Sequence, residues 1–298
     1  MNTESLFAPF VDRPGFARLL AAALLLVACD RAPAPVQKTP PLSANEAADA
    51  SLDVPANTST LTVEGSAFVL RVADGRVLRG AELQGAVLHV ALDGGQVAPL
   101  KLASIVPDPE TPEILRHDFQ TSDGQGGWKT ACPPNADGET WGFPVSLPEG
   151  HPGRDGDVTV TCVSGAVGKC VRWGYPPWMK GPGGEDLAPF HAACVHMARA
   201  DYCGDNRPRT KEGTSIDNYD DLGIQRRGAA KDPAYVFEAG WGAQGAVCVA
   251  HPRWSDVATL EQIQADCPRL AAVPLCNEAS ARGLGARMFN TSKLLPAR

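Results

Sequence analysis

The chain has 298 residues, with 34 acidic and 27 basic side chains and a formal net charge of −7. This acidic balance, with no visible run of basic residues, argues against binding to nucleic acid or to an anionic membrane face. Roughly 240 residues follow the N-terminal segments described below, which suits one larger domain or two small ones.

Residues 1–28 have the layout of a bacterial secretory signal peptide. Arg13 and Arg18 precede an apolar run from Leu19 to Ala28, which is too short to span a bilayer as a helix. The run ends in Leu26-Val27-Ala28-Cys29, which resembles the lipobox of bacterial lipoproteins. We therefore predict that Cys29 becomes the mature N-terminus and carries acyl chains such as palmitate. The alternative is ordinary cleavage near this point, with Cys29 unmodified.

Residues 29–59 are predicted to form a disordered, Pro-rich tether. Five prolines stand among Ala, Ser, Thr and Asn, so the segment cannot bury enough apolar surface to offset its ordering entropy. A tether of this length lets the folded part stand away from the membrane. The expected location is the cell envelope, at the outer membrane or the periplasmic face of the inner membrane.

Residues 60–125 are predicted to form a small N-terminal β module. Short alternating runs of apolar residues are separated by Asp74-Gly75 and by Asp93-Gly94-Gly95, which are strong hairpin signals. The segment between Gly80 and Gly85 predicts a turn or a bulge. His89, within an apolar run, is interpreted as a structural histidine.

Residues 126–298 are predicted to form a second, disulfide-rich domain with one principal helix. Apolar residues at helical spacing after Asp186 predict this helix over Leu187–Tyr202, ended by Gly204 in a left-handed conformation. Strands are expected at residues 158–162, 235–238 and 246–249. Thr259 and Gln262 form a capping-box pattern for a short helix that ends at Pro268. The tail after Asn277 is polar and basic, with no predicted element.

Eight cysteines remain after the lipidated one, and an even number in an exported chain indicates four disulfides. Short spacings favour Cys162 with Cys170, Cys194 with Cys203, and Cys267 with Cys276, which leaves Cys132 for Cys248. A structural zinc site is less favoured because no Cys-x-x-Cys pair is present. No metal site is predicted on this basis.

Two further segments are informative, one rich in aromatic residues and one rich in acidic residues. Arg172-Trp173-Gly174-Tyr175-Pro176-Pro177-Trp178 is interpreted as a small aromatic core beneath the principal helix, in preference to a platform for a sugar or peptide. The second segment reads Ala200-Asp201-Tyr202-Cys203-Gly204-Asp205 and then Gly213-Thr214-Ser215-Ile216-Asp217-Asn218-Tyr219-Asp220-Asp221-Leu222-Gly223-Ile224-Gln225.

This second segment resembles the signature of the ADYC domain family of bacterial envelope lipoproteins. The resemblance covers residues 128–292 and includes Val171-Arg172-Trp173-Gly174-Tyr175 and Phe237-Glu238-Ala239-Gly240-Trp241. One departure is Asn206, where the family pattern has glycine; asparagine is among the residues that tolerate positive φ. The resemblance implies no particular reaction and transfers no catalytic residue.

Candidate chemistry has to be sought in the residues themselves. His191 or His196, with Asp201 and Ser215, could supply a base, an orienting carboxylate and a nucleophile. His191 and His196 are five positions apart and face different ways on a helix, and no Gly-x-Ser-x-Gly or His-Glu-x-x-His motif is present. Asp201, Asp205, Asp217, Asp220 and Asp221 also invite a Ca²⁺ site, although solvated turns are the preferred interpretation.

The sequence therefore predicts an α+β protein that is β-rich and disulfide-braced, with one principal helix and a preceding small β module. The expected function is a lipid-anchored, extracytoplasmic binding or interaction module with an envelope protein or polysaccharide as partner. The alternative is an extracytoplasmic hydrolase acting on envelope polymers. Neither nucleic acid nor a cofactor is expected, with Ca²⁺ kept as the alternative.

Overall fold

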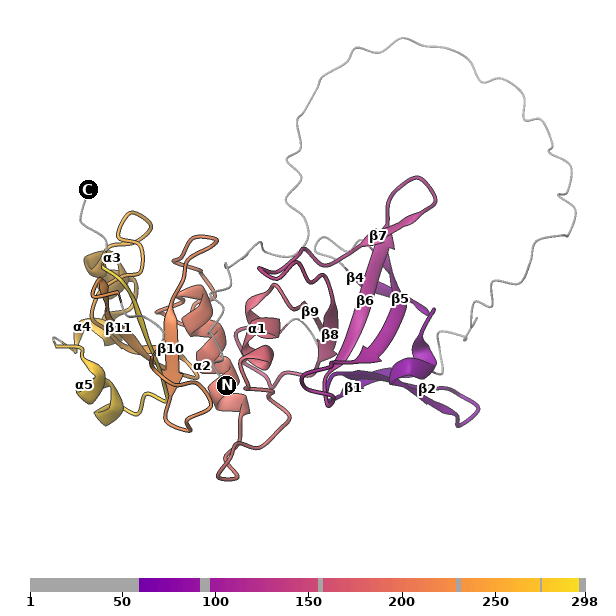
Figure 1. The fold of residues 1–298 in the computed structure, drawn as a ribbon, viewed down its shortest axis with the longest axis horizontal. Helices are drawn as coiled ribbons and strands as arrows, with labels where there is room; N and C mark the ends of the chain where they lie inside the picture. Colours follow the sequence, from indigo (N-terminus) through magenta and orange to yellow (C-terminus); the bar gives the residue numbers. More distant parts are fainter. Residues whose placement is uncertain (1–58, 92–96, 155–157, 229–231, 274, 295–298) are drawn as a thin grey trace, which may run out of the picture.

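The computed structural model describes residues 59–91, 97–154, 158–228, 232–273 and 275–294. The predicted secretory signal, Cys29 and the Pro-rich segment up to residue 58 lie outside the described residues, as does the Asp93-Gly94-Gly95 turn. The described part is an α+β structure built on three antiparallel sheets, as Figure 1 shows. None of its helices is long and apolar enough to cross a lipid bilayer.

The first sheet has three short strands in the order β1-β2-β3, which are Thr60–Glu64, Ala67–Arg71 and Val77–Arg79. The predicted Asp74-Gly75 turn joins β2 to β3, and Gly75 has the positive φ of 87° that glycine permits. A short 3₁₀ helix, η1 (Gly80–Leu83), follows where the sequence predicted a turn. Leu83 and Phe68 bury their side chains beneath this sheet.

The second sheet has six strands and runs in the order β4-β5-β6-β8-β9, with β7 paired to β6. The strands are Val87–Ala91, Val97–Pro107, Leu115–Ser122, Trp128–Thr130, Gly142–Val145 and Thr159–Cys162, for β4 to β9. The predicted strand at 158–162 is confirmed as β9. Since β6 and β7 pair, the domain boundary expected after residue 125 falls inside one continuous sheet.

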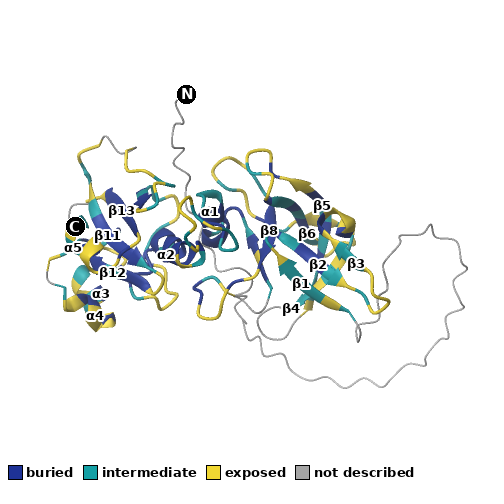
Figure 2. Cartoon of the chain, turned by 90° about the horizontal axis from the view of Figure 1, so that it is seen from below, coloured by how far each residue is buried: buried dark blue, intermediate teal, exposed yellow. Residues whose placement is uncertain are grey.

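Two helices lie between the second and third sheets (Figure 2). They are α1 (Ala166–Arg172) and the principal helix α2 (Ala188–Arg199). The helix was predicted to continue to Tyr202, but it ends at Arg199 because Ala200 takes a left-handed conformation, with φ of 48°. Gly204, the predicted cap, has φ of 71° in the following turn. α1 was not predicted, because its seven residues are too few to show a helical period.

The third sheet has the order β10-β13-β11-β12, from Asp217–Asp220, Met288–Lys293, Tyr235–Gly242 and Gly245–Val249. The predicted strands at 235–238 and 246–249 are confirmed as parts of the β11-β12 hairpin. β13 comes from the tail for which no element was predicted. It is an inner strand, and its polar Asn290, Thr291 and Ser292 are buried, so the alternation typical of a half-exposed strand is missing.

Three short helices complete the C-terminal part: α3 (Leu260–Asp266), α4 (Pro268–Ala271) and α5 (Glu278–Gly283). The predicted capping box is confirmed, because the Thr259 side chain accepts a hydrogen bond from the Gln262 backbone N–H and the Gln262 side chain accepts from that of Thr259. Pro268 ends α3 and begins α4, as expected for a residue without a backbone N–H.

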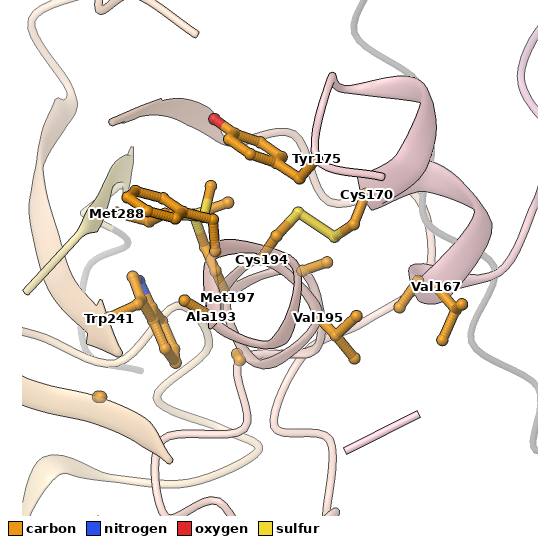
Figure 3. Close-up of a cluster of buried hydrophobic side chains, with 14 of the residues drawn as sticks. Val167, Cys170, Tyr175, Ala193, Cys194, Val195, Met197, Trp241 and Met288 are labelled. Carbon is orange, nitrogen blue, oxygen red and sulfur yellow. A yellow bond between two sulfur atoms is a disulfide. The ribbon is translucent and has the colours of Figure 1, made fainter. Parts of the chain in front are cut away.

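The main hydrophobic core surrounds α2. Figure 3 shows Met197, Val195 and Cys194 of this helix between Val167 of α1 on one side and Trp241 of β11 on the other. Separate, smaller cores lie under the first two sheets and on the far side of the third sheet. The helix is therefore the central packing element of the C-terminal half.

All eight cysteines after residue 29 form disulfides, but none of the pairings favoured by spacing is correct. The structure joins Cys132 to Cys162, Cys170 to Cys194, Cys203 to Cys267, and Cys248 to Cys276. Cysteines that are near in sequence lie on different elements. Cys170–Cys194 fixes α1 against α2 (Figure 3), whereas each of the other three bonds has at least one cysteine outside the helices and strands.

Candidate functional site

Asp201, in the first part of the signature (Ala200 to Asp205), holds together the turn after α2. Its carboxylate accepts hydrogen bonds from His196 Nδ1 at 2.9 Å and from the backbone N–H groups of Asp205 and Asn206 at 3.1 and 3.0 Å. Arg209 lies 3.8 Å away on the other side. Asp201 is fully buried, so this carboxylate serves the protein's own backbone.

Tyr202 is the centre of a buried polar network between α2 and β11. Its hydroxyl donates to Glu238 Oε1 at 3.1 Å and accepts from the Arg253 backbone N–H at 2.8 Å. Its ring stacks on Trp241, with 5.3 Å between centroids. Burial raises the pKa of the Tyr202 hydroxyl well above its ordinary value, so it stays protonated and donates.

Glu238 and Arg253 form an ion pair without solvent contact. Arg253 donates from Nε and Nη2 to the two oxygens of Glu238 at 3.1 and 2.9 Å. Burial alone would raise the pKa of Glu238, but the guanidinium outweighs it and the pKa lies below its usual value. The sequence did not predict the ion pair between Glu238 and Arg253. Glu238 stood within a quoted motif piece, whereas Arg253 carried no signal.

The next signature residues form a disulfide and a partly buried ion-pair cluster. Cys203 bonds to Cys267. A Cβ on Gly204 would lie 2.4 Å from the Gln244 carbonyl oxygen, so only glycine fits there. Asp205 receives hydrogen bonds from Arg207 and Arg209. Burial opposes ionisation of Asp205, but these arginines lower its pKa below the ordinary value.

The second half of the signature builds a tight turn around Asp220. Its carboxylate accepts from the Tyr175 hydroxyl at 2.5 Å and from the backbone N–H groups of Leu222, Ile224 and Gln225 at 2.6, 3.3 and 2.6 Å. Burial, with the nearby carboxylate, raises the pKa of Tyr175 far above its usual value. This turn is thereby attached to the aromatic segment before α2.

The remaining signature residues also have structural partners or turn conformations. Gln225 donates to the Trp173 carbonyl at 2.8 Å, and Tyr219 donates to Glu278 at 2.8 Å. Gly213 and Gly223 have φ of 76° and 74°. Ile224 packs against the main core, and Asp217 is buried in β10 opposite Thr291.

The aromatic segment forms a core, as predicted. Tyr175 is fully buried and stacks on Phe190 of α2, with 6.5 Å between ring centroids. Trp173 and Trp178 are partly buried and pack against the same core.

The structure separates His191 from Asp201, the two weak catalytic candidates. His191 is fully buried and bonds to His151 Nε2 at 2.9 Å and to the Val167 carbonyl at 3.1 Å. Asp201 pairs with His196 instead. The combination of His191 as base with Asp201 as its orienting group is therefore wrong. His151 was not identified from the sequence, because a single histidine before a Pro-Gly pair gives no indication of its buried partner.

The acidic residues are engaged by partners within the protein, and Asp201 and Asp205 share Arg209. Asp201, Asp205 and Asp220 have the bonds described above, and Asp221 pairs with Arg282. Within the residues that the structure describes, no group of three or more His, Cys, Asp or Glu side chains is placed to hold a metal ion. The protein partners of these carboxylates include arginine side chains and backbone N–H groups.

These observations define a disulfide-braced α+β domain whose signature residues make several separate sets of internal hydrogen bonds. The family model for the ADYC domain matches residues 80–255. This match covers more than half of the chain, and the protein belongs to the ADYC domain family. The match begins at η1 and so includes the second sheet as well as the signature. Neither the curated proteins nor the solved structures give a significant match.

Proposed function

We propose that this protein is a lipid-anchored, non-catalytic binding or interaction module on the extracytoplasmic side of the bacterial envelope. The observation that carries this proposal is the pairing of all eight cysteines after Cys29. Disulfides of this number form and persist in oxidising compartments, and they are rare in the cytosol. Together with the lipobox-like sequence at Cys29, they favour export followed by lipidation.

The geometry of the signature supports binding rather than hydrolysis of envelope polymers. His191, His196 and Asp201 are buried. His196 bonds to Asp201, whereas His191 bonds to His151 and to the Val167 carbonyl. A hydrolase needs its base, its orienting group and its nucleophile within mutual hydrogen-bonding reach. The family signature instead supports a rigid scaffold, which would present its surface to an envelope protein or polysaccharide.

Mass spectrometry of the protein extracted from its native membrane tests the proposal. The expected result is a mature chain that begins at acylated Cys29, with no reactive thiol before reduction and eight after it. A Cys29→Ser variant is the matched control and should carry no lipid while keeping its four disulfides. An unmodified N-terminus together with eight free thiols would contradict the proposal.

A further inference from the structure

A backbone contact at the end of the third sheet joins two segments that carry four exposed arginines in an otherwise acidic protein. Arg226 and Arg227 follow the Asp220 turn, and Arg282 and Arg287 lie at α5 and before β13. The Asp221 backbone N–H donates to the Arg287 carbonyl at 3.2 Å, which holds the two segments side by side. We call these four residues the arginine patch. The sequence shows no such cluster because its two segments are far apart in the chain.

Fixed contacts hold several of the guanidinium groups in place. Arg282 pairs with both Asp221 and Glu278, and Arg227 lies 3.4 Å from Glu278. Arg287 lies over the Phe190 ring at 5.8 Å from its centroid. Asp221 and Glu278 carry two negative charges against the four positive ones, which leaves an excess of two positive charges among these six side chains.

An exposed apolar side chain lies in the segment that joins two of these arginines. Leu284 is 50% exposed and stands between Arg282 and Arg287, in a loop where Gly285 has φ of 84°. Arginine binds phosphate oxygens through its planar guanidinium. An apolar side chain among basic residues can enter the headgroup region of a bilayer. The combination fits an anionic phospholipid surface better than a soluble polyanion, which would leave Leu284 without a partner.

We propose that the arginine patch is a second membrane contact that docks the folded domain on anionic phospholipid headgroups. This inference rests on the proposed lipid anchor, since the anchor would keep the domain within reach of such a surface. A single lipid and a basic surface reinforce each other in membrane attachment. The patch would then orient the domain, with the third sheet facing the membrane and the second sheet facing away from it.

Vesicle binding by the full chain carrying Cys29→Ser tests the inference, because this chain lacks the lipid. Partitioning of the protein is measured on vesicles that contain phosphatidylglycerol and on vesicles of pure phosphatidylcholine. The apolar N-terminal segment contributes to the partition coefficient on both kinds of vesicle. The ratio of the two partition coefficients reports the patch. We expect this ratio to exceed one at low salt and to fall as salt rises, since exposed charges are screened.

The decisive variant is Arg226→Glu/Arg287→Glu, with Lys129→Glu/Arg76→Glu, on the first two sheets, as the control. All four positions are exposed, and both variants change the net charge equally. Each basic residue near an anionic surface contributes about fivefold to binding, so the variant in the arginine patch should lower the ratio by about 25-fold or more. The control variant should lower it much less. Circular dichroism checks that both variants are folded.

Equal partitioning of the parent chain on the two vesicle types would overturn the inference, and so would equal losses in the two variants. Both results are distinct from failure of the proposed anchor. An unlipidated Cys29 in the native protein would remove the anchor without changing the vesicle ratio of the patch.

Discussion

The buried pair of His151 and His191 has only one arrangement of protons that satisfies both rings. The Val167 carbonyl must accept, so His191 carries its proton on Nε2. His191 Nδ1 then accepts from His151 Nε2–H, and His151 Nδ1 accepts from the Gly153 backbone N–H at 3.0 Å. A proton added to either ring would turn an acceptor into a donor that faces another donor. The native structure therefore requires both histidines to be neutral.

This requirement predicts that acid destabilises the fold. Burial lowers the pKa of His151 to about 3, with a further contribution from the charges of His191 and His196, and it lowers the pKa of His191 to about 4. In the unfolded chain both groups take up protons below about pH 6.5. The unfolded state thus binds more protons, and the free energy of unfolding should fall as the pH drops from about 6.5 toward 4.

Urea denaturation between pH 7 and pH 4.5 measures this dependence. Each histidine contributes a slope of up to about 1.4 kcal/mol per pH unit. His151→Gln should reduce the slope by about this amount, whereas His89→Gln, at an exposed position of β4, should change it less. Buried His117 also has a pKa lowered to about 4 by burial, so part of the slope will remain. An unchanged slope in His151→Gln would show that the pair does not titrate in this way.

At the scale of elements, Arg253 attaches the C-terminal end of α2 to β11. It donates to the Met197 and Ala198 carbonyls at 2.8 and 3.2 Å. The last carbonyls of a helix lack intrahelical partners, although that of Met197 also accepts from the Ala200 backbone N–H at 3.1 Å. Its other donors bind Glu238. The side chains are 2% and 0% exposed, so each charge depends on the other for compensation.

Breaking this pair on one side should destabilise the protein strongly. Arg253→Met leaves the Glu238 carboxylate buried without its cation, and we expect a loss of about 3–5 kcal/mol in the free energy of unfolding. Arg253→Met/Glu238→Leu removes both charges and should recover part of this loss, although the α2 carbonyls stay without their donor. Chemical denaturation of the two single variants and the double variant forms a cycle. Losses that simply add in the double variant would argue against mutual compensation.

The elements that could be predicted from the sequence are those with local signals. The Asp74-Gly75 turn, the Thr259 capping box and the β11-β12 hairpin all depend on neighbouring residues. The disulfide pairing and β13 could not be predicted, because they depend on which distant segments of the chain meet in the fold. The signature was found as a pattern, but its role was not, since the partners of Asp201 and Tyr202 come partly from beyond the segment. The arginine patch is a product of the same long-range pairing.

At the scale of the whole molecule, one core connects the two halves of the described chain. The cluster around α2 includes Phe143 and Val145 of β8 in the second sheet and Trp241 and Met288 in the third sheet. Phe143 is fully buried and meets Trp178 edge-on, with 6.4 Å between ring centroids. The first sheet joins this arrangement through Gly65, which lies against the Trp178 ring. The sheets therefore share side chains that no single sheet could bury alone.

A shared core predicts cooperative unfolding of the described residues, although chains of this length often unfold in stages. With the disulfides intact, urea transitions followed by far-UV circular dichroism and by tryptophan fluorescence should coincide. Phe143→Ala should lower the stability by about 3–5 kcal/mol, since it opens a cavity in the shared core, and it should shift both transitions together. Val160→Ala, at a 37% exposed position on the adjacent strand β9, is the control and should have a small effect. If Phe143→Ala shifted one transition and left the other in place, the halves would be independent folding units, and the core around α2 would only connect them.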